Sequence, residues 1–133
     1  MVLSHQDMIT LFRNSAPYIN AHRGKTFVLM ISGEAIESPT LPTIIHDIAL
    51  LNTLGVRVVI VHGARPQIDE RIELRNIKGR FHGDVRITDK TTLECVKDAA
   101  GSVRSQVEAL LTMGLANSPM HGARIRVIGG NFI

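Results

Sequence analysis

Residues 26–31 read TFVLMI, an unbroken apolar run that a Ser-Gly-Glu turn follows at once. Its length and its β-branched and aromatic residues predict a strand, and the lack of polar alternation is typical of a strand buried on both faces. Residues 56–61, VRVVIV, form a second run of this kind, which ends before His62 and Gly63. Two such strands indicate a parallel sheet.

Helical patterns separate and follow these strands. Residues 44–54 carry apolar side chains at helical spacing and end at Gly55, and residues 67–75 form a similar pattern after the second strand. The alternation of strand and helix predicts a βαβ unit and an α/β fold, here an αβα sandwich with a mainly parallel sheet.

An amphipathic helix is expected before the first strand, over residues 4–19, with Ser4 as its N-cap. Its apolar face is formed by Met8, Ile9, Leu11, Phe12 and Ala16. A lone helix of this length is marginal in water, so we expect this face to pack on another surface. We therefore divide the chain into residues 1–24, an N-terminal helix for assembly or regulation, and residues 25–133, the α/β domain.

The remaining residues extend the α/β pattern. Residues 76–84 are rich in glycine and charge and predict a loop or hairpin, and residues 85–88 alternate like a strand. Residues 89–113 predict a long helix, in which Gly101 marks a close packing contact or a kink. A further strand is expected at residues 123–128. Because a parallel sheet is normally covered on both faces, we expect the chain to be a truncated part of a larger domain.

Composition excludes several classes of protein. With 133 residues the chain has room for one domain, and its 44% hydrophobic and 20% charged residues are ordinary for a globular protein. The apolar runs are too short to span a membrane and no signal-peptide pattern is present, so we expect a cytoplasmic location. The lone Cys95 fits a reducing compartment and a core position. The formal charge is +3, but the basic residues are scattered among few aromatics, so nucleic acid is not an expected partner.

The two glycine turns that follow the strands are the candidate binding site. In an open α/β sheet the carboxyl ends of neighbouring strands meet, and backbone N–H groups there favour anions. The candidate residues are Gly33, His62, Gly63 and Arg65. Neither turn matches a dinucleotide or P-loop motif, and tight turns that need glycine for their backbone are the alternative explanation. The six histidines show no metal-ligand spacing, so no metal site is expected.

Five segments, taken in order, resemble the amino-acid kinase family. They are residues 22–26 (HRGKT), 30–33 (MISG), 47–51 (DIALL), 61–68 (VHGARPQI) and 85–89 (VRITD). Within the family, residues 17–19 and 63–69 look like the kinase-like domain that precedes the acetyltransferase domain of bacterial N-acetylglutamate synthases. The resemblance covers nearly the whole chain and implies the N-terminal part of that kinase-like domain, with the acetyltransferase domain absent.

Two departures from the family pattern bear on chemistry. Active kinases of the family carry Lys-x-Gly-Gly after the first strand, where the lysine neutralises charge on the transferring phosphoryl group, whereas this chain has Met30 in place of the lysine. The His-Gly-Gly-Gly turn of the kinases lets phosphate approach the backbone, whereas Ala64 and Arg65 add side chains here. We therefore expect no phosphoryl transfer and assign no catalytic residue.

The resemblance also implies roles for two residues outside the turns. Arg86 matches the position that holds a substrate carboxylate in the kinases, and an ion-paired or surface arginine is the alternative. Tyr18 matches a helix tyrosine near the arginine effector of regulated relatives, and an ordinary packing residue is the alternative. In those relatives the N-terminal helix interlaces with its copy from a neighbouring subunit, which implies a homo-oligomer.

The implied function is that of a regulatory and assembly segment of a glutamate N-acetyltransferase, which makes N-acetylglutamate from glutamate and acetyl-CoA in the first step of arginine biosynthesis. Arginine and a glutamate-like molecule are the implied ligands. Acetyl-CoA belongs to the absent domain, and no cofactor is expected in this segment. Two alternatives stay open: a working acetylglutamate kinase, which Met30 argues against, and a stand-alone anion- or nucleotide-binding module.

Overall fold

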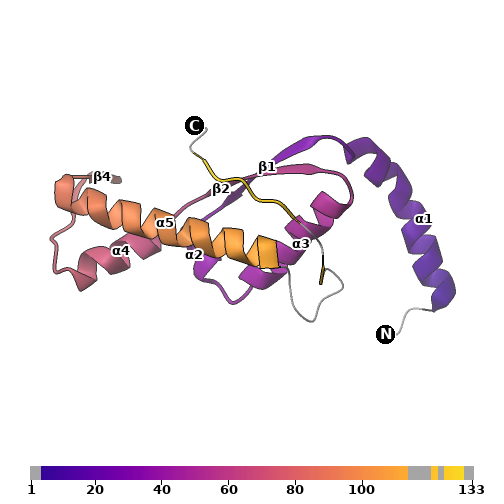
Figure 1. Ribbon diagram of the computed structural model, residues 1–133, viewed down its shortest axis with the longest axis horizontal. Coiled ribbons are helices and arrows are strands. Elements are labelled where there is room, and N and C mark those ends of the chain that lie inside the picture. Colours follow the sequence, from indigo (N-terminus) through magenta and orange to yellow (C-terminus); the bar gives the residue numbers. More distant parts are fainter. Residues whose placement is uncertain (1–3, 114–120, 123–124, 131–133) are drawn as a thin grey trace.

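The computed structural model describes residues 4–113, 121–122 and 125–130. In chain order the elements are α1 (His5–His22), β1 (Thr26–Ile31), α2 (Gly33–Glu37), α3 (Leu41–Thr53), β2 (Arg57–His62), α4 (Arg65–Leu74), β3 (Arg80–His82), β4 (Val85–Ile87) and α5 (Lys90–Met113). Helix α1 projects from one end of an elongated molecule, and α4 with the β3–β4 pair forms the other end (Figure 1).

Strands β1 and β2 form a parallel pair, with α2 and α3 as the crossover between them. Their register runs from Thr26 opposite Arg57 to Ile31 opposite His62, so the two strands finish level with each other. The two turns that follow them therefore emerge side by side. The predicted βαβ unit and the α/β fold with a parallel sheet are confirmed.

The hydrophobic core lies on one face of this sheet. Leu29 and Ile31 of β1 and Val58 and Ile60 of β2 point toward it. The helices contribute the buried side chains Ile36, Leu41, Ile45, Ile48, Val103, Val107 and Leu111. Burial of this apolar surface supplies most of the free energy that holds α2, α3 and α5 against the strands.

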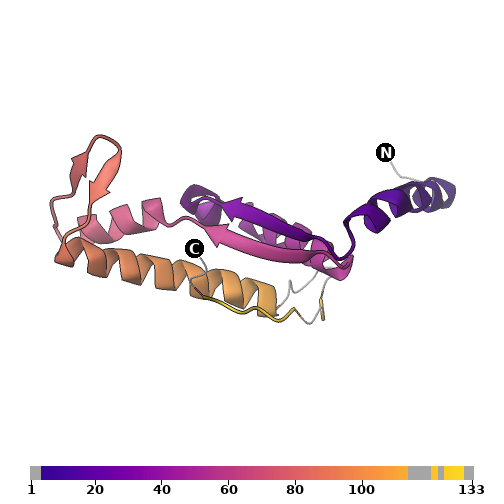
Figure 2. The same ribbon diagram turned by 90° about the horizontal axis from the view of Figure 1, so that it is seen from above.

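The opposite face of the sheet is open in the part of the chain that the structure describes. Val28 is 67% exposed and Met30 is 80% exposed, and Figure 2 shows the two strands from above with the helices on their far side and along one edge. The expectation that residues 26–31 are buried on both faces is therefore wrong for these residues. The run is apolar on both faces, but α3 and α5 cover only one of them, so the second helical layer of the sandwich is not formed by the described helices.

Helix α1 begins with a reciprocal capping box, in which Ser4 Oγ accepts from the Asp7 N–H and the Asp7 carboxylate accepts from the Ser4 N–H. The predicted helix is confirmed, although it ends at His22 rather than at residue 19. None of its residues is buried, and Phe12 is 73% exposed. The apolar face of α1 therefore does not pack on the sheet of its own chain in the part that the structure describes.

The short helix α2 was not expected from the sequence, which indicated only a turn after the first strand. Ser32 caps it, because its hydroxyl oxygen accepts a hydrogen bond from the Ala35 N–H at 3.2 Å. The expected hairpin is confirmed, since β3 pairs antiparallel with β4. The long helix is confirmed as well, and Cys95 is fully buried in it.

Gly101 lies within α5 without interrupting it, and a Cβ added there would meet nothing within 4 Å. The interpretation of Gly101 as a close packing contact is therefore wrong. The glycine faces open space on a solvent-exposed turn of the helix.

The strand predicted at residues 123–128 is not formed by residues 125–128, which the structure describes without regular secondary structure, while residues 123 and 124 lie outside the described part. Apolar alternation is present, since Val127 packs against the core and Ile128 is 86% exposed. A strand also needs a ladder of backbone hydrogen bonds, and here a cavity separates this segment from β2.

Candidate functional site

The two turns after β1 and β2 touch each other through their backbones. The Gly63 N–H donates to the Ile31 carbonyl at 2.8 Å, which extends the β1–β2 pairing by one step. A Cβ added at Gly63 would lie 3.0 Å from the Gly33 nitrogen. Gly63 therefore allows the close approach of the two turns, and a Cβ at Gly33 would lie 2.6 Å from Pro66 Cδ at the start of α4. Both observations favour the alternative explanation, that these turns need glycine for their backbone. We call residues 32–34 and 63–65 together the two-turn junction.

Helix α4 starts from this junction without a side-chain cap. Its N-cap residue is Ala64, which has no oxygen to accept from the first N–H groups, and Pro66 stands in the first turn. The N-terminal end of a helix carries partial positive charge. The uncapped N-terminus of α4 is thus one of the features for which the sequence suggested an anion site at the junction.

Gln67 is a buried polar residue at this place that sequence reasoning missed. It is 7% exposed, and its Nε2 donates to the Gly33 carbonyl at 2.8 Å. Its Oε1 is buried without a hydrogen-bond partner among the described residues. In the sequence, the sign of a buried polar side chain at Gln67 is a polar residue at an inward position of a helix. That pattern does not reveal its hydrogen-bond partner, which lies 34 residues away in the chain.

Glu34 contributes a carboxylate to the junction. Hydrogen bonds from its own backbone N–H and from the Ser32 hydroxyl hold the pKa of Glu34 below its ordinary value, and the positive charge of Arg65 adds to this effect. The carboxylate is therefore ionised at neutral pH beside the start of α2.

The two candidate arginines connect α4 with the β3–β4 hairpin. Arg65 donates from Nη2 to the Asp84 carbonyl at 3.1 Å. Arg86 forms an ion pair with Asp69 of α4, and its guanidinium carbon lies 4.7 Å from the centre of the Phe81 ring. The Arg86 side chain is only 13% exposed. Arg86 is thus an ion-paired arginine in this structure, which is the alternative to a role in holding a substrate carboxylate.

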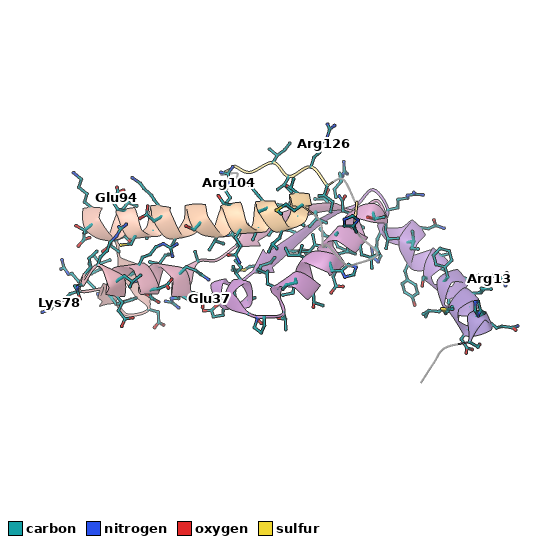
Figure 3. All side chains as sticks on the ribbon, turned by 60° about the horizontal axis from the view of Figure 1, so that its bottom comes forward. Arg13, Glu37, Lys78, Glu94, Arg104 and Arg126 are labelled. Carbon is teal, nitrogen blue, oxygen red and sulfur yellow. The ribbon has the colours of Figure 1, made fainter. Side chains whose placement is uncertain are left out.

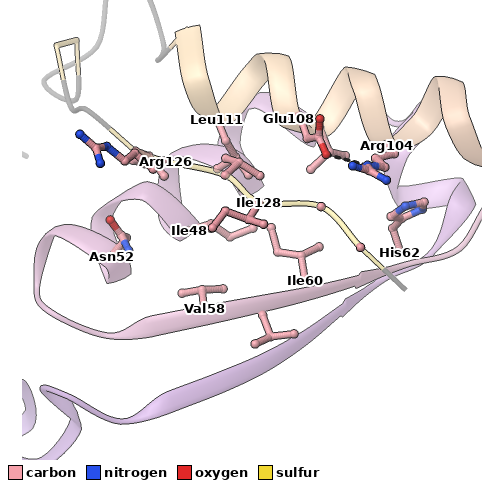
Figure 4. A pocket seen from close by; sticks show the side chains of 16 residues that line it. Ile48, Asn52, Val58, Ile60, His62, Arg104, Glu108, Leu111, Arg126 and Ile128 are labelled. Atoms are coloured by element: carbon pink, nitrogen blue, oxygen red, sulfur yellow. Dashed lines mark hydrogen bonds and ion pairs between the residues drawn. The ribbon is translucent and has the colours of Figure 1, made fainter. Parts of the chain in front are cut away.

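His62 faces a different space, a cavity of about 490 Å³ between β2, α3, α5 and residues 125–130 (Figure 4). Its walls are mostly apolar, and on the α5 side Arg104 and Glu108, one helical turn apart, form an ion pair at 2.7 Å. A Cβ added at Gly129 would lie within 2.4 Å of the Arg104 guanidinium, so this side chain lies directly on the glycine. Gly129 and Gly130 follow an apolar run in the sequence and line this cavity, and they are not among the candidate residues.

Tyr18 and Met30 are both exposed, on α1 and on β1 respectively. Tyr18 is 71% exposed on α1, which leads away from the sheet toward the N-terminus (Figure 1). Met30 points from β1 onto the open face of the sheet. The structure therefore gathers Gly33, Gly63 and Arg65 in one place, but it does not bring Tyr18 to them.

Charged side chains are spread over the surface rather than gathered on one face, as the labelled residues from Arg13 to Arg126 illustrate (Figure 3). No group of three or more His, Cys, Asp and Glu side chains that could hold a metal ion occurs among the described residues. None of the helices that the structure describes is long and apolar enough to cross a membrane.

The known proteins that this chain resembles are amino-acid acetyltransferases and an N-acetylglutamate synthase. The chain is 56% identical over 128 residues to an amino-acid acetyltransferase of Azotobacter vinelandii, and 52% identical over 127 residues to one of Pseudomonas aeruginosa. Each match covers 96% of this chain but only 30% and 29% of the relative. The N-acetylglutamate synthase of Neisseria gonorrhoeae, solved with coenzyme A and N-acetyl-glutamate, superposes with a TM-score of 0.74 at 35% identity, over 93% of this chain and 27% of that chain.

The chain thus spans less than a third of the length of the relatives that it matches. The model of the amino acid kinase family matches residues 25–132, which is the whole region from β1 onward. This match agrees with the parallel β1–β2 pair and with the two glycine turns at its carboxyl end. The chain belongs to the amino acid kinase family.

Proposed function

We propose that this chain is a kinase-like regulatory and assembly segment of a cytoplasmic glutamate N-acetyltransferase, the enzyme that makes N-acetylglutamate from glutamate and acetyl-CoA in the first step of arginine biosynthesis. The observation that carries this proposal is the 52–56% identity with amino-acid acetyltransferases over 96% of the chain. In this proposal the chain holds no catalytic residue, and acetyl-CoA binds to a part of the enzyme outside it.

The loss of phosphoryl transfer is supported by Met30. The family's kinases place a lysine at this position, and the thioether that replaces it carries no positive charge to stabilise a transferring phosphoryl group. Met30 also lies on the open face of the sheet and is 80% exposed. These features weigh against the alternative of a working acetylglutamate kinase.

The assembly role is assigned to α1. Its exposed apolar residues have no partner within the described part of this chain, and a helix with such a face gains stability by packing on another surface. The proposed partner is the same helix of a second subunit. Tyr18 would then lie at the contact, where we place the arginine effector, while Gly33, His62, Gly63, Arg65 and Arg86 remain the candidates for contacts with a glutamate-like ligand.

A chimeric enzyme tests the function. In it, this chain replaces the matching N-terminal residues of the Azotobacter vinelandii acetyltransferase, and thiol release from acetyl-CoA is measured with and without glutamate. We expect glutamate-dependent release that arginine inhibits, no release by the 133-residue chain alone, and weaker arginine inhibition in a Tyr18→Ala chimera.

The outcomes separate the alternatives. ADP release by the 133-residue chain with ATP and N-acetylglutamate, at about 1 to 100 per second, would identify a working kinase instead. A chimera that folds but lacks glutamate-dependent release would favour a stand-alone binding module. Unchanged arginine inhibition in the Tyr18→Ala chimera would reject only the effector role of Tyr18.

A further inference from the structure

The connection between α1 and β1 is a type II turn over residues 22–25. The Lys25 N–H donates to the His22 carbonyl at 2.9 Å, which closes the turn. Arg23 has φ −55° and ψ 130°, and Gly24 has φ +76°, as this type of turn requires. Glycine is needed here for its left-handed φ alone, because a Cβ added at Gly24 would meet nothing within 4 Å.

The turn between α3 and β2 braces this connection with three hydrogen bonds. The Gly24 N–H donates to the Gly55 carbonyl at 2.8 Å, and the Arg57 N–H donates to the Lys25 carbonyl at 2.8 Å. The third bond comes from the Arg57 side chain, whose Nη2 donates to the Gly24 carbonyl at 2.8 Å. Arg57 therefore holds two successive carbonyls of the connection, one through its backbone and one through its guanidinium.

Side chains of the connection also lie on the residues that brace it. A Cβ added at Gly55 would lie 3.0 Å from Arg23 Cγ and 3.2 Å from Arg23 Nε, so the Arg23 side chain rests on this glycine. The His22 ring meets the Phe27 ring edge-on, with the ring centres 5.4 Å apart. We call residues 22–25 together with Gly55 and Arg57 the α1 elbow.

The rest of α1 receives no comparable support from the described part of the chain. None of its residues is buried, and the helix projects away from the sheet (Figures 1 and 2). Its 18 residues span about 27 Å, so a small rotation of the backbone at the elbow moves its first residues a long way. The direction of α1 therefore depends on how firmly the elbow is held.

We propose that Arg57 is the positioning residue that sets the direction of α1, through its bond to the Gly24 carbonyl. This inference deepens the assembly role and rests on the proposed function in that respect, because the direction of α1 decides how the helices of two subunits can meet. The brace itself belongs to one chain and is tested without assembly.

Amide hydrogen exchange on the full chain tests the brace. Arg57→Ala removes the guanidinium but keeps the backbone bond to Lys25. We expect the protection factors of the Gly24 and Lys25 amides to fall about 2- to 10-fold, while amides of α5 keep theirs. Arg57→Lys retains a donor that can reach the Gly24 carbonyl, so its effect should be smaller. The matched control is Lys25→Ala, which removes an exposed cation of the same elbow and should leave the Gly24 amide unchanged.

Residual dipolar couplings of the α1 and α5 amides test the direction of α1. They are measured on a Phe12→Asp background, where the new charge on an exposed apolar residue keeps α1 from packing on a second copy. On this background we expect one common orientation to fit both helices, and Lys25→Ala should not change it. Adding Arg57→Ala should shrink the α1 couplings relative to those of α5, because α1 then samples several directions. Arg57→Lys should restore part of the loss.

Unchanged protection of Gly24 in a folded Arg57→Ala chain would overturn the proposal. So would undiminished α1 couplings in that variant, or an equal effect of Lys25→Ala. Should circular dichroism show that Phe12→Asp melts α1, the couplings are measured without this substitution and decide in the same way. An oligomer size that Phe12→Asp leaves unchanged in the chimeric enzyme would instead reject the assembly role of α1, and would leave the brace in place.

Discussion

Arg86 of β4 pairs with the carboxylate of Asp69 on α4, although 17 residues separate them in the chain. The contact docks the β3–β4 hairpin on α4, together with the hydrogen bond from Arg65 to the Asp84 carbonyl. It also means that the arginine which the family resemblance associates with a ligand carboxylate already holds one from its own chain. A ligand at this position would have to displace Asp69.

The Arg86 contacts lead to a prediction on stability. Arg86→Ala removes the ion pair with a half-exposed Asp69 and the cation–π contact with Phe81, and we expect it to lower the free energy of unfolding by about 1–2 kcal/mol. Arg86→Lys keeps the positive charge but not the planar guanidinium, so it should lower the free energy of unfolding by less than Arg86→Ala does. Urea denaturation measures both. Lys78→Ala, an exposed cation just before the hairpin, is the control, and an equal loss in this variant would contradict the prediction.

Phe12 provides a test of the N-terminal helix. Phe12→Asp should leave the 133-residue chain folded, because Phe12 is 73% exposed and α1 buries none of its residues. In the chimeric enzyme the same substitution should lower the oligomer size, since dissociation avoids burial of the new charge. Circular dichroism and light scattering report the two effects. Ile45→Asp, at a site 1% exposed, should unfold the chain. Unchanged oligomer size would argue against the assembly role of α1.

Gly101 and Gly33 should respond in opposite ways to alanine. A Cβ at Gly101 enters open space within α5, so Gly101→Ala should raise the free energy of unfolding by about 0.5–1 kcal/mol through helix propensity. Gly33→Ala should lower it by about 1–3 kcal/mol, because the Cβ would meet the Pro66 ring at 2.6 Å. Thermal and urea denaturation measure both changes. A destabilising Gly101→Ala would show that the helix needs the glycine for another reason.

Asp89 caps the N-terminus of α5, and the stability that this cap contributes depends on pH. Its Oδ1 accepts from the Thr92 N–H at 2.8 Å, and hydrogen bonds from the Thr92 backbone and hydroxyl are the main causes that hold the pKa of Asp89 below its ordinary value of 3.8. Because the pKa is lower in the folded chain, this contribution to stability is fully present above pH 3.8 and is lost as the pH falls through the lowered pKa.

Substitution of Asp89 tests this cap. Asp89→Ala should lower the melting temperature at neutral pH, and the difference from wild type should shrink in acid below pH 3.8. Asp89→Asn keeps an acceptor without the charge, so it should retain much of the stability and lose the acid dependence of this position. Melting curves between neutral pH and strong acid measure both variants. A difference that stays constant with pH would show that the carboxylate charge plays no part.

The local elements followed from the sequence because they depend on neighbours along the chain. Two apolar runs, the second interrupted only by Arg57, predicted β1 and β2 to within one residue, and Ser4 predicted the start of α1. The replacement of the kinase lysine by Met30 is likewise a statement about one position and needs no structure. The short helix α2 escaped because it has a single turn and a half, too little for a periodic pattern to be recognised.

Contacts between distant segments were decided only by the tertiary structure. A pattern of apolar residues reports which positions prefer burial, but not which surfaces are available to bury them. Residues 26–31 therefore predicted a strand correctly and its second covered face incorrectly, and residues 125–128 have the alternation of a strand without the hydrogen-bonded neighbour that makes one. Gln67 lies 34 residues from the carbonyl that it binds, and only the packing of α4 against α2 brings the two together.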